Sequence, residues 1–302
     1  MRGRRIGEAD KPGPEPTPLK LLTANLGSWG TMAPWVATLP DDVLLLQETR
    51  ITDAGLPAAK ATAAADGWHG AWSPAQPNAA GPASGGLAVL ARGGRRVAAI
   101  PHAGAHRDRW LHTAVERSKG QVLHVVSLYG WDAGTPGAAA KNAALFREVF
   151  AEMAALGAAP WVIGGDWNVQ AQDVWDVVAD DGRHHFLPRP SGDTSGGTCA
   201  PAGRRIDFFV AGTALAGRVS MEKIVADPSL HPHQPVRLQV ACGGPPADIP
   251  VLDTPAAFVD ADGGGLQRPL PAGDGPWRVM APEWQATVAE LPRPPSMTVA
   301  SH

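Results

Sequence analysis

The sequence predicts an α/β fold in which two β-sheets pack face to face and helices cover their outer faces. Short apolar segments of strand-like length recur between residues 19 and 241, and few segments between them have helical character. Many strands with few helices fit two packed sheets better than a single doubly wound sheet. Apolar residues make up 44% of the chain, which is enough to form a hydrophobic core.

The strands are predicted from short runs of apolar residues. The first two, Leu19–Leu26 and Val43–Gln47, have the apolar character of buried strands. The other predicted strands are, in chain order, Gly86–Ala91, Trp110–Glu116, Gln121–Tyr129, Trp161–Gly165, Ile206–Ala211, Gly217–Val225 and Val236–Ala241.

Two helices are predicted between these strands. Leu56–Ala65 is an alanine-rich segment with a weak helical pattern. Ala138–Leu156 has the clearest pattern, because its larger apolar residues recur at helical spacing and form one face.

The two ends of the chain differ from its middle and are expected to lie outside a domain that spans residues 19–241. Residues 1–18 are charged and carry prolines at positions 12, 14, 16 and 18, which predicts a flexible leader. Residues 242–302 are rich in proline and glycine and are predicted to form a tail. A short helix is expected there at Pro282–Leu291.

Composition and charge exclude several classes of protein. The chain has 26 Lys+Arg and 29 Asp+Glu, and this near-neutral balance argues against a nonspecific coat on nucleic acid. No apolar run approaches the ~18 residues of a membrane span, so no membrane partner is expected. Two cysteines cannot form a disulfide framework or a four-cysteine zinc site. With no secretory signal visible, we expect an intracellular protein, nuclear or cytoplasmic, that is not secreted.

Polar residues stand at the ends of the predicted strands, where side chains from several strands can meet. They are Asn25, Glu48, Tyr129, Asp166, Asn168, Asp207 and His233. Carboxylates and an amide gathered in this way suit a hard divalent cation, which prefers oxygen ligands. A histidine beside such a site can position or protonate a phosphoryl oxygen.

An ordered set of short motifs carries these residues: TANL, LLQET, GGLAVLAR, VVSLYGW, IGGDWN, RRIDFFVA and HPHQPVRL. Each motif alone is weak, but seven in this order are specific. Over residues 19–241 the chain resembles the endonuclease/exonuclease/phosphatase superfamily. This superfamily includes exonuclease III, apurinic/apyrimidinic endonucleases, DNase I and the endonuclease domains of non-LTR retrotransposons.

The resemblance implies a DNase I-like four-layer α/β sandwich, with two packed mixed sheets flanked by helices. It also implies a monomeric endonuclease that hydrolyses a phosphodiester in nucleic acid, with DNA favoured, and depends on Mg²⁺ or Mn²⁺. Two alternatives remain open at this point: a phosphatase acting on a small phosphoester, and a noncatalytic nucleic-acid-binding domain that inherited the fold.

The resemblance also assigns the metal ligands. It makes Glu48 the main ligand, with Asn25 supporting the site and Asp207 contributing on the side of the histidine. In a different context each of these residues would be an ordinary turn or strand terminus.

The same resemblance implies the catalytic residues. Asp166 would orient or deprotonate the attacking water, and Asn168 would hold Asp166 and a phosphate oxygen. Tyr129 and His233 would contact the phosphate.

The last motif departs from the family's Ser-Asp-His-x-Pro-Val pattern, because Pro232 replaces the aspartate before His233. We expect that aspartate to orient the histidine, so its loss predicts reduced or lost activity. Asp227 is the nearest upstream carboxylate that could substitute for it.

Arginines and tryptophans near the motifs allow two interpretations each. The arginines could bind a phosphate backbone or form a solvated basic face; they are Arg92, Arg95, Arg96, Arg107, Arg109, Arg204 and Arg205. Trp29, Trp131 and Trp167 could stack on an exposed base, although packing is the commoner use of tryptophan.

Overall fold

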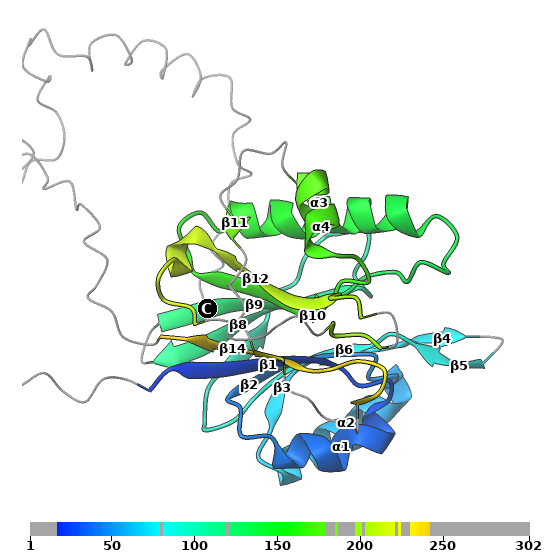
Figure 1. The fold of residues 1–302 in the computed structure, drawn as a ribbon. Helices are drawn as coiled ribbons and strands as arrows, with labels where there is room; N and C mark the ends of the chain where they lie inside the picture. Colours follow the sequence, from blue (N-terminus) through cyan, green and yellow to red (C-terminus); the bar gives the residue numbers. More distant parts are fainter. Residues whose placement is uncertain are drawn as a thin grey trace, which may run out of the picture. The chain divides into compact units, whose positions relative to one another are not determined.

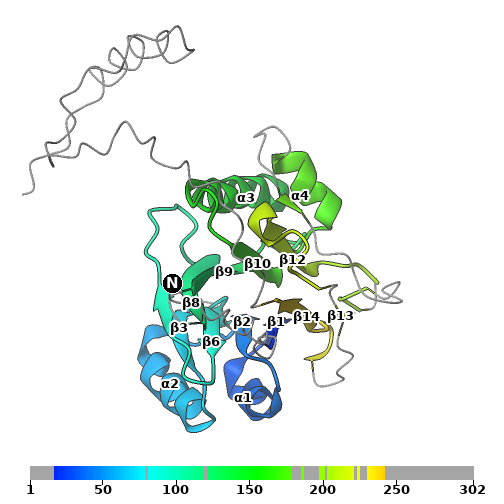
Figure 2. The same ribbon diagram turned by 90° about the vertical axis from the view of Figure 1, so that its left-hand side faces the viewer.

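The computed structural model describes residues 17–78, 81–118, 121–178, 185–186, 197–200, 203–220, 223–224 and 230–241. In this part of the chain, two six-stranded sheets lie face to face with helices on their outer faces (Figure 1). The helices are α1 (Trp29–Thr38), α2 (Leu56–Ala65), α3 (Ala138–Ala155) and α4 (Ala171–Val178). One sheet is covered by α1 and α2, the other by α3 and α4, which Figure 2 shows from the side. The predicted four-layer α/β sandwich is confirmed.

The first sheet is mixed and has the order β13–β14–β1–β2–β6–β3. These strands span Lys223–Ile224, Val236–Val240, Leu19–Asn25, Val43–Gln47, Leu87–Ala91 and His69–Ser73. Only β1 and β2 pair in parallel, and the other neighbours are antiparallel.

The second sheet is also mixed and has the order β11–β12–β10–β9–β8–β7. Its strands span His185–Phe186, Asp207–Gly212, Trp161–Asp166, Gln121–Tyr129, Trp110–Ser118 and Val97–Ala99. Its single parallel pair is β9 with β10. A separate two-stranded ribbon, β4 (Gln76–Asn78) with β5 (Gly81–Ser84), extends from the sandwich (Figure 1).

Most predicted elements coincide with observed ones, and one does not. The predicted strand Gly217–Val225 is wrong at its start, because residues 216–218 form a turn in which Gly217 has a φ of 71°. Residues 221–222 and 225 lie outside the described residues. Only Lys223–Ile224 pairs there as β13, with a single bridge from Val219 to Val240. The predicted tail helix Pro282–Leu291, the tail and residues 1–16 of the leader lie outside the described residues.

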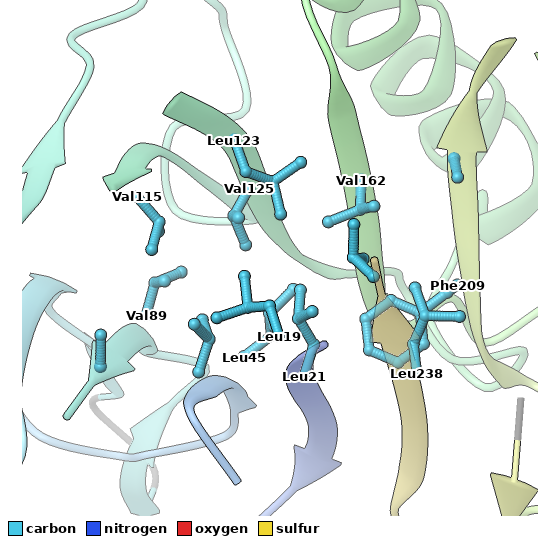
Figure 3. Packing of buried hydrophobic residues seen from close by; sticks show 14 of the residues in the cluster. Leu19, Leu21, Leu45, Val89, Val115, Leu123, Val125, Val162, Phe209 and Leu238 are labelled. Atoms are coloured by element: carbon cyan, nitrogen blue, oxygen red, sulfur yellow. The ribbon is translucent and has the colours of Figure 1, made fainter. Parts of the chain in front are cut away.

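Successive side chains of a central strand point alternately into two different cores, which explains why these strands are largely apolar on both faces. Leu21 and Leu45 point between the sheets, whereas Leu22 and Leu44 point toward α1 and α2. Figure 3 shows the core between the sheets, to which both contribute: Leu19, Leu21, Leu45, Val89, Val115, Leu123, Val125, Val162, Phe209 and Leu238. Among the described residues, no helix is both long and apolar enough to cross a bilayer.

Two features bring the sheets close together near the ends of β2 and β10. Gly164 has no room for a side chain, because a Cβ there would lie 2.4 Å from the Phe209 ring and 3.1 Å from Leu45. Buried Gln47 donates a hydrogen bond of 2.9 Å across the interface to the Ser127 hydroxyl. A buried polar pair of this kind is stable only while both partners stay matched.

A pair of histidines lies between the second sheet and α3. The His112 side chain is completely buried, with Nε2 3.0 Å from Nδ1 of His124 and Nδ1 3.5 Å from a carboxylate oxygen of Glu152. Burial, followed by the nearby His124 and His102, lowers the pKa of His112 to about 4.

This shift predicts that acid destabilises the fold between pH 6.5 and pH 4. The unfolded chain protonates His112 near pH 6.5 and the folded chain only near pH 4, so the unfolded state binds the extra proton in this window. The free energy of unfolding, measured with urea, should fall by up to about 3 kcal/mol more for the parent than for His112→Gln as the pH falls from 7 to 4. A matched variant of an exposed histidine, His69→Gln, should follow the parent. If His112→Gln also follows the parent, the acid sensitivity has another origin.

Candidate active site

The sequence-predicted polar residues meet at one end of the sandwich, and both sheets contribute. Asn25 ends β1, Glu48 follows β2 and His233 precedes β14 in the first sheet. In the second sheet, Asp166 at the end of β10 lies between its register partners Tyr129 on β9 and Asp207 on β12.

Asp166 is the centre of this arrangement and is only 1% exposed. One carboxylate oxygen accepts a hydrogen bond of 2.9 Å from the Asn25 amide across the sheets. The other accepts one of 3.1 Å from the backbone N–H of Asn168. The Asn25 oxygen accepts from Gly27 N–H and the Asn168 amide donates to Gly130, so both asparagines are held in place.

Asp207 and His233 form a second pair that also joins the two sheets. Nδ1 of His233 lies 3.1 and 3.2 Å from the two carboxylate oxygens of Asp207. Nε2, the other ring nitrogen, lies 3.7 Å from Asp166. Ligand atoms of these three residues all lie within 4.8 Å of one another, so the group can hold a metal ion.

The three groups perturb one another electrostatically. Burial and the negative charge of Asp207 raise the pKa of Asp166 well above that of a free carboxyl, although His233 opposes this. Burial also raises the pKa of Asp207, against the hydrogen bonds from His233 and Thr198. Burial would lower the pKa of His233, but the Asp207 hydrogen bond and the surrounding carboxylates raise it above its usual value. These directions favour a protonated His233 ring while no metal is bound, and they make the Asp166 carboxylate a stronger proton acceptor than a free one.

Glu48 lies at the edge of the same site, with its side chain 19% exposed. It accepts a short hydrogen bond from the Tyr129 hydroxyl and a hydrogen bond of 3.0 Å from Arg50. Burial and the charge of Glu48 raise the pKa of Tyr129, so the phenol stays protonated and acts as a donor.

Two site residues have a strained backbone. Glu48 has a φ of 50° and Asn168 a φ of 55°, both in the left-handed region that non-glycine residues rarely adopt. Such strain persists where the surrounding structure imposes it, and it is concentrated at functional sites.

The structure corrects one expectation about the last motif. Pro232 does not leave the His233 ring without an orienting carboxylate, because Asp207 holds Nδ1. The predicted loss of activity on this ground is therefore wrong in its premise. Asp227, the alternative orienting group, lies outside the described residues.

The tryptophans follow the packing interpretation where they are buried. Trp167 is fully buried and stacks on Phe208, and Trp29 is 4% exposed and packs edge-on against Trp72. Trp131 is partly buried and contacts the guanidinium of Arg109.

Thr198 is a site residue that the sequence analysis missed. It is fully buried, and its hydroxyl oxygen accepts hydrogen bonds of 3.0 Å from Ile206 N–H and 2.9 Å from Asp207 N–H. Its carbonyl accepts a bond of 2.8 Å from Gln234 N–H, next to His233. One threonine thus ties the segments that carry Asp207 and His233 together. A lone threonine in a glycine-rich stretch gives no signal in the sequence.

We expect Thr198→Val to lower kcat roughly tenfold to hundredfold while KM changes little, because the Asp207–His233 pair loses its alignment. Thr198→Ser keeps the hydroxyl and should restore kcat. Thr113→Val is the matched control, since the hydroxyl of buried Thr113 is also hydrogen-bonded, in this case as a donor to the Val125 carbonyl at 3.0 Å, at another place in the sheet. Both valine variants should lose about 1–3 kcal/mol of stability. An equal fall of kcat in both would reduce Thr198 to a structural residue.

Comparisons with known proteins agree with this geometry. A model of the Endonuclease/Exonuclease/phosphatase family matches residues 22–238. No curated protein matches the chain. Among solved structures, the 3'-5' exonuclease NExo from Neisseria meningitidis is 20% identical with a TM-score of 0.55, covering 73% of this chain and 99% of that one.

Two further structures show how widely the fold is shared. The Xenopus laevis APE2 catalytic domain is 14% identical with a TM-score of 0.58, covering 74% of this chain and 91% of that one. Sphingomyelinase C from Streptomyces griseocarneus is 20% identical with a TM-score of 0.50, covering 74% of this chain and 99% of that one. At these identities the likeness concerns the fold alone. The family match spans nearly the whole predicted domain, and the chain is therefore a phosphoesterase that belongs to the endonuclease/exonuclease/phosphatase family.

Proposed function

We propose that this phosphoesterase is a divalent-metal-dependent endonuclease that hydrolyses phosphodiesters in DNA. The observation that supports the reaction type best is the buried Asp166 carboxylate, held by two asparagines and facing the Asp207–His233 pair. Such a group can accept a proton near neutral pH next to a cationic donor, which is what hydrolysis of a phosphate diester requires.

The donor set fits a hard divalent cation. Burial and, after it, the charge of the neighbouring Asp207 raise the pKa of Asp166, and a cation nearby would relieve the repulsion between the two carboxylates. Glu48 and Asn25 would hold Mg²⁺ through oxygen atoms, and Asp207 would contribute beside His233. Mn²⁺ tolerates the same ligands and is an alternative. When bound, the ion neutralises charge on the scissile phosphate and the leaving oxygen.

The chain's own residues handle the water. Asp166 accepts a proton from the attacking water, because burial raises the pKa of its carboxyl and makes the carboxylate a stronger base than a free one. The hydrogen bonds from Asn25 and Asn168 hold the carboxylate in one orientation, so the water is aligned before the reaction begins.

The phosphate is held by donors that stay protonated. His233 carries its proton on the ring that Asp207 orients, and Nε2 points into the site toward Asp166. The Tyr129 hydroxyl lies beside Glu48 and can donate to a phosphate oxygen. Both donors stabilise negative charge on the phosphate without a covalent intermediate.

A nicking assay tests the proposal. Supercoiled plasmid should be nicked in the presence of Mg²⁺, should not be nicked with a chelator, and should be nicked far more slowly by His233→Ala. Single-stranded RNA, an abasic duplex, an inositol phosphate and sphingomyelin complete the panel. If the inositol phosphate or sphingomyelin is turned over and the plasmid is not nicked, the proposal of DNA as the substrate is wrong and the ester that is turned over takes its place. No turnover of any substrate would favour a noncatalytic binding domain.

A further inference from the structure

Arg109 is fixed to the strand that carries Tyr129, although the site described above does not use it. It directly precedes β8, and its carbonyl accepts a hydrogen bond of 2.8 Å from Tyr129 N–H. Its own N–H donates to the His106 carbonyl at 2.9 Å. The backbone of Arg109 is therefore placed as firmly as that of Tyr129.

The guanidinium lies against two aromatic rings. Its central carbon is 5.0 Å from the ring centroid of Tyr129 and 4.7 Å from that of Trp131. The side chain is only 16% exposed. These cation–π contacts hold the planar group at the Trp131 side of Tyr129, while the Tyr129 hydroxyl points to Glu48.

This cation has no hydrogen-bond acceptor in the described part of the chain. The nearest carboxylate is Asp108, whose oxygen lies 3.5 Å from Nε without forming a hydrogen bond, and Nε itself is buried. The buried Nε cannot be reached from solvent, so the terminal N–H groups, which have no acceptor among the described residues, are the donors available to a partner. Leaving donors of a largely enclosed cation unpaired is costly, and a bound anion would pair them.

The loop that presents Arg109 is organised in advance by Glu148 on α3. This carboxylate accepts hydrogen bonds from Ala105 N–H at 2.9 Å, from the His106 ring at 2.8 Å and from the Trp110 indole at 2.8 Å. A partner of Arg109 therefore does not have to order the loop, and its binding energy is not spent on doing so.

We propose that Arg109 forms a subsite for a second phosphate of the substrate, next to the scissile one. The proposal rests on the proposed function, because it takes Tyr129, Asp166 and His233 as the centre that binds the scissile phosphate. A guanidinium matches the geometry of phosphate oxygens, and consecutive phosphates of a strand offer such a neighbour at a regular spacing. The subsite selects a polynucleotide over an ester that contains a single phosphate.

Binding of a single-stranded DNA oligonucleotide in the presence of EDTA tests the subsite without turnover. By fluorescence anisotropy, Arg109→Gln should bind about tenfold more weakly than the parent, the loss expected for one charged hydrogen bond. In a plot of log affinity against log salt concentration, the slope for the variant should be shallower than that for the parent by about 0.7. Arg96→Gln is the control: it removes the same charge from an exposed arginine beside Glu116, toward the opposite end of β8, and should bind like the parent.

Replacing one backbone phosphate at a time with a neutral methylphosphonate locates the contact. At one position beside the scissile phosphate, this replacement should weaken binding by the parent by the same factor as the Arg109→Gln substitution does. The same replacement should not weaken binding by Arg109→Gln any further. With Mg²⁺, the variant should lose at least about ten times more kcat/KM on the oligonucleotide than on bis(4-nitrophenyl) phosphate, which has one phosphate.

The outcomes separate the two proposals. Equal binding by the parent and Arg109→Gln would overturn the subsite alone. An equal loss on the oligonucleotide and on bis(4-nitrophenyl) phosphate would place Arg109 on the scissile phosphate and would also overturn it. A parent that binds no oligonucleotide at any salt concentration would overturn the subsite together with the proposed nuclease function.

Discussion

Replacing Asp166 with asparagine is expected to lower kcat for phosphodiester hydrolysis by about 10³-fold. The variant keeps the shape of the side chain but cannot accept a proton from water, and general-base catalysis contributes roughly 10²–10⁴-fold. Asp176→Asn makes the same chemical change at an exposed residue of α4 and should leave kcat unaltered. A fall of less than about tenfold in Asp166→Asn would remove Asp166 as the base.

The same variant should change how stability depends on pH when metal is chelated. Because the folded-state pKa of Asp166 is raised, ionising this carboxyl at neutral pH costs folding free energy. An asparagine carries no such cost, but it can accept only one of the two hydrogen bonds that the carboxylate accepts from Asn25 and Asn168. Relative to the parent, the variant should therefore gain stability as the pH rises from below the unfolded value of 3.8 to above the folded pKa. Urea unfolding at pH 3 and pH 8 measures this change, and a stability difference that does not depend on pH would contradict the raised pKa.

Glu48→Gln is expected to raise the Mg²⁺ concentration for half-maximal activity by at least about 100-fold, because the proposed main ligand loses its charge. Even the loss of a residue that only hydrogen-bonds to a metal ligand lowers metal affinity or activity ~10–100-fold. The fold should survive, since the glutamine oxygen can still accept the hydrogen bond from Tyr129. The bond from Arg50 is lost, but the Arg50 side chain is exposed and can be solvated by water.

Two measurements distinguish metal binding from other effects of this change. Isothermal titration of Mg²⁺ should show weaker binding in Glu48→Gln and no change in Glu116→Gln, whose carboxylate lies on β8 beside Arg96. Identical rates for Glu48→Gln and the parent at every Mg²⁺ concentration would rule out Glu48 as the principal ligand.

The layers of the fold could be predicted from the sequence because the central strands are buried on both faces. β2 is apolar at every position except Gln47, since alternate residues enter different cores. Elements that break the usual patterns could not be predicted. α1 contains Pro34. β3 includes Gly70, where a Cβ would lie 2.0 Å from the Val89 carbonyl, so the strand depends on a close approach that composition does not reveal.

The members of the site could be predicted because polar residues at the ends of neighbouring strands share one edge of a sheet. Their pairing could not, because it depends on how the two sheets face each other. Asp207 and His233 are 26 positions apart and belong to different sheets, so nothing local connects them. For the same reason, Pro232 suggested that His233 lacks an orienting carboxylate, because the sequence shows only the neighbour in the chain. The carboxylate that orients His233 is Asp207, which lies on the other sheet.

The division of the site between the two sheets makes catalysis depend on the thickness of the core. Asn25 reaches Asp166, and His233 reaches Asp207, only at the separation that Gly164 allows and that the Gln47–Ser127 hydrogen bond maintains. A core substitution that widened this gap by a fraction of a bond length would misalign both pairs while leaving every site residue present. The turnover rate of this enzyme can therefore be adjusted by changes in side-chain volume at positions that no substrate ever touches.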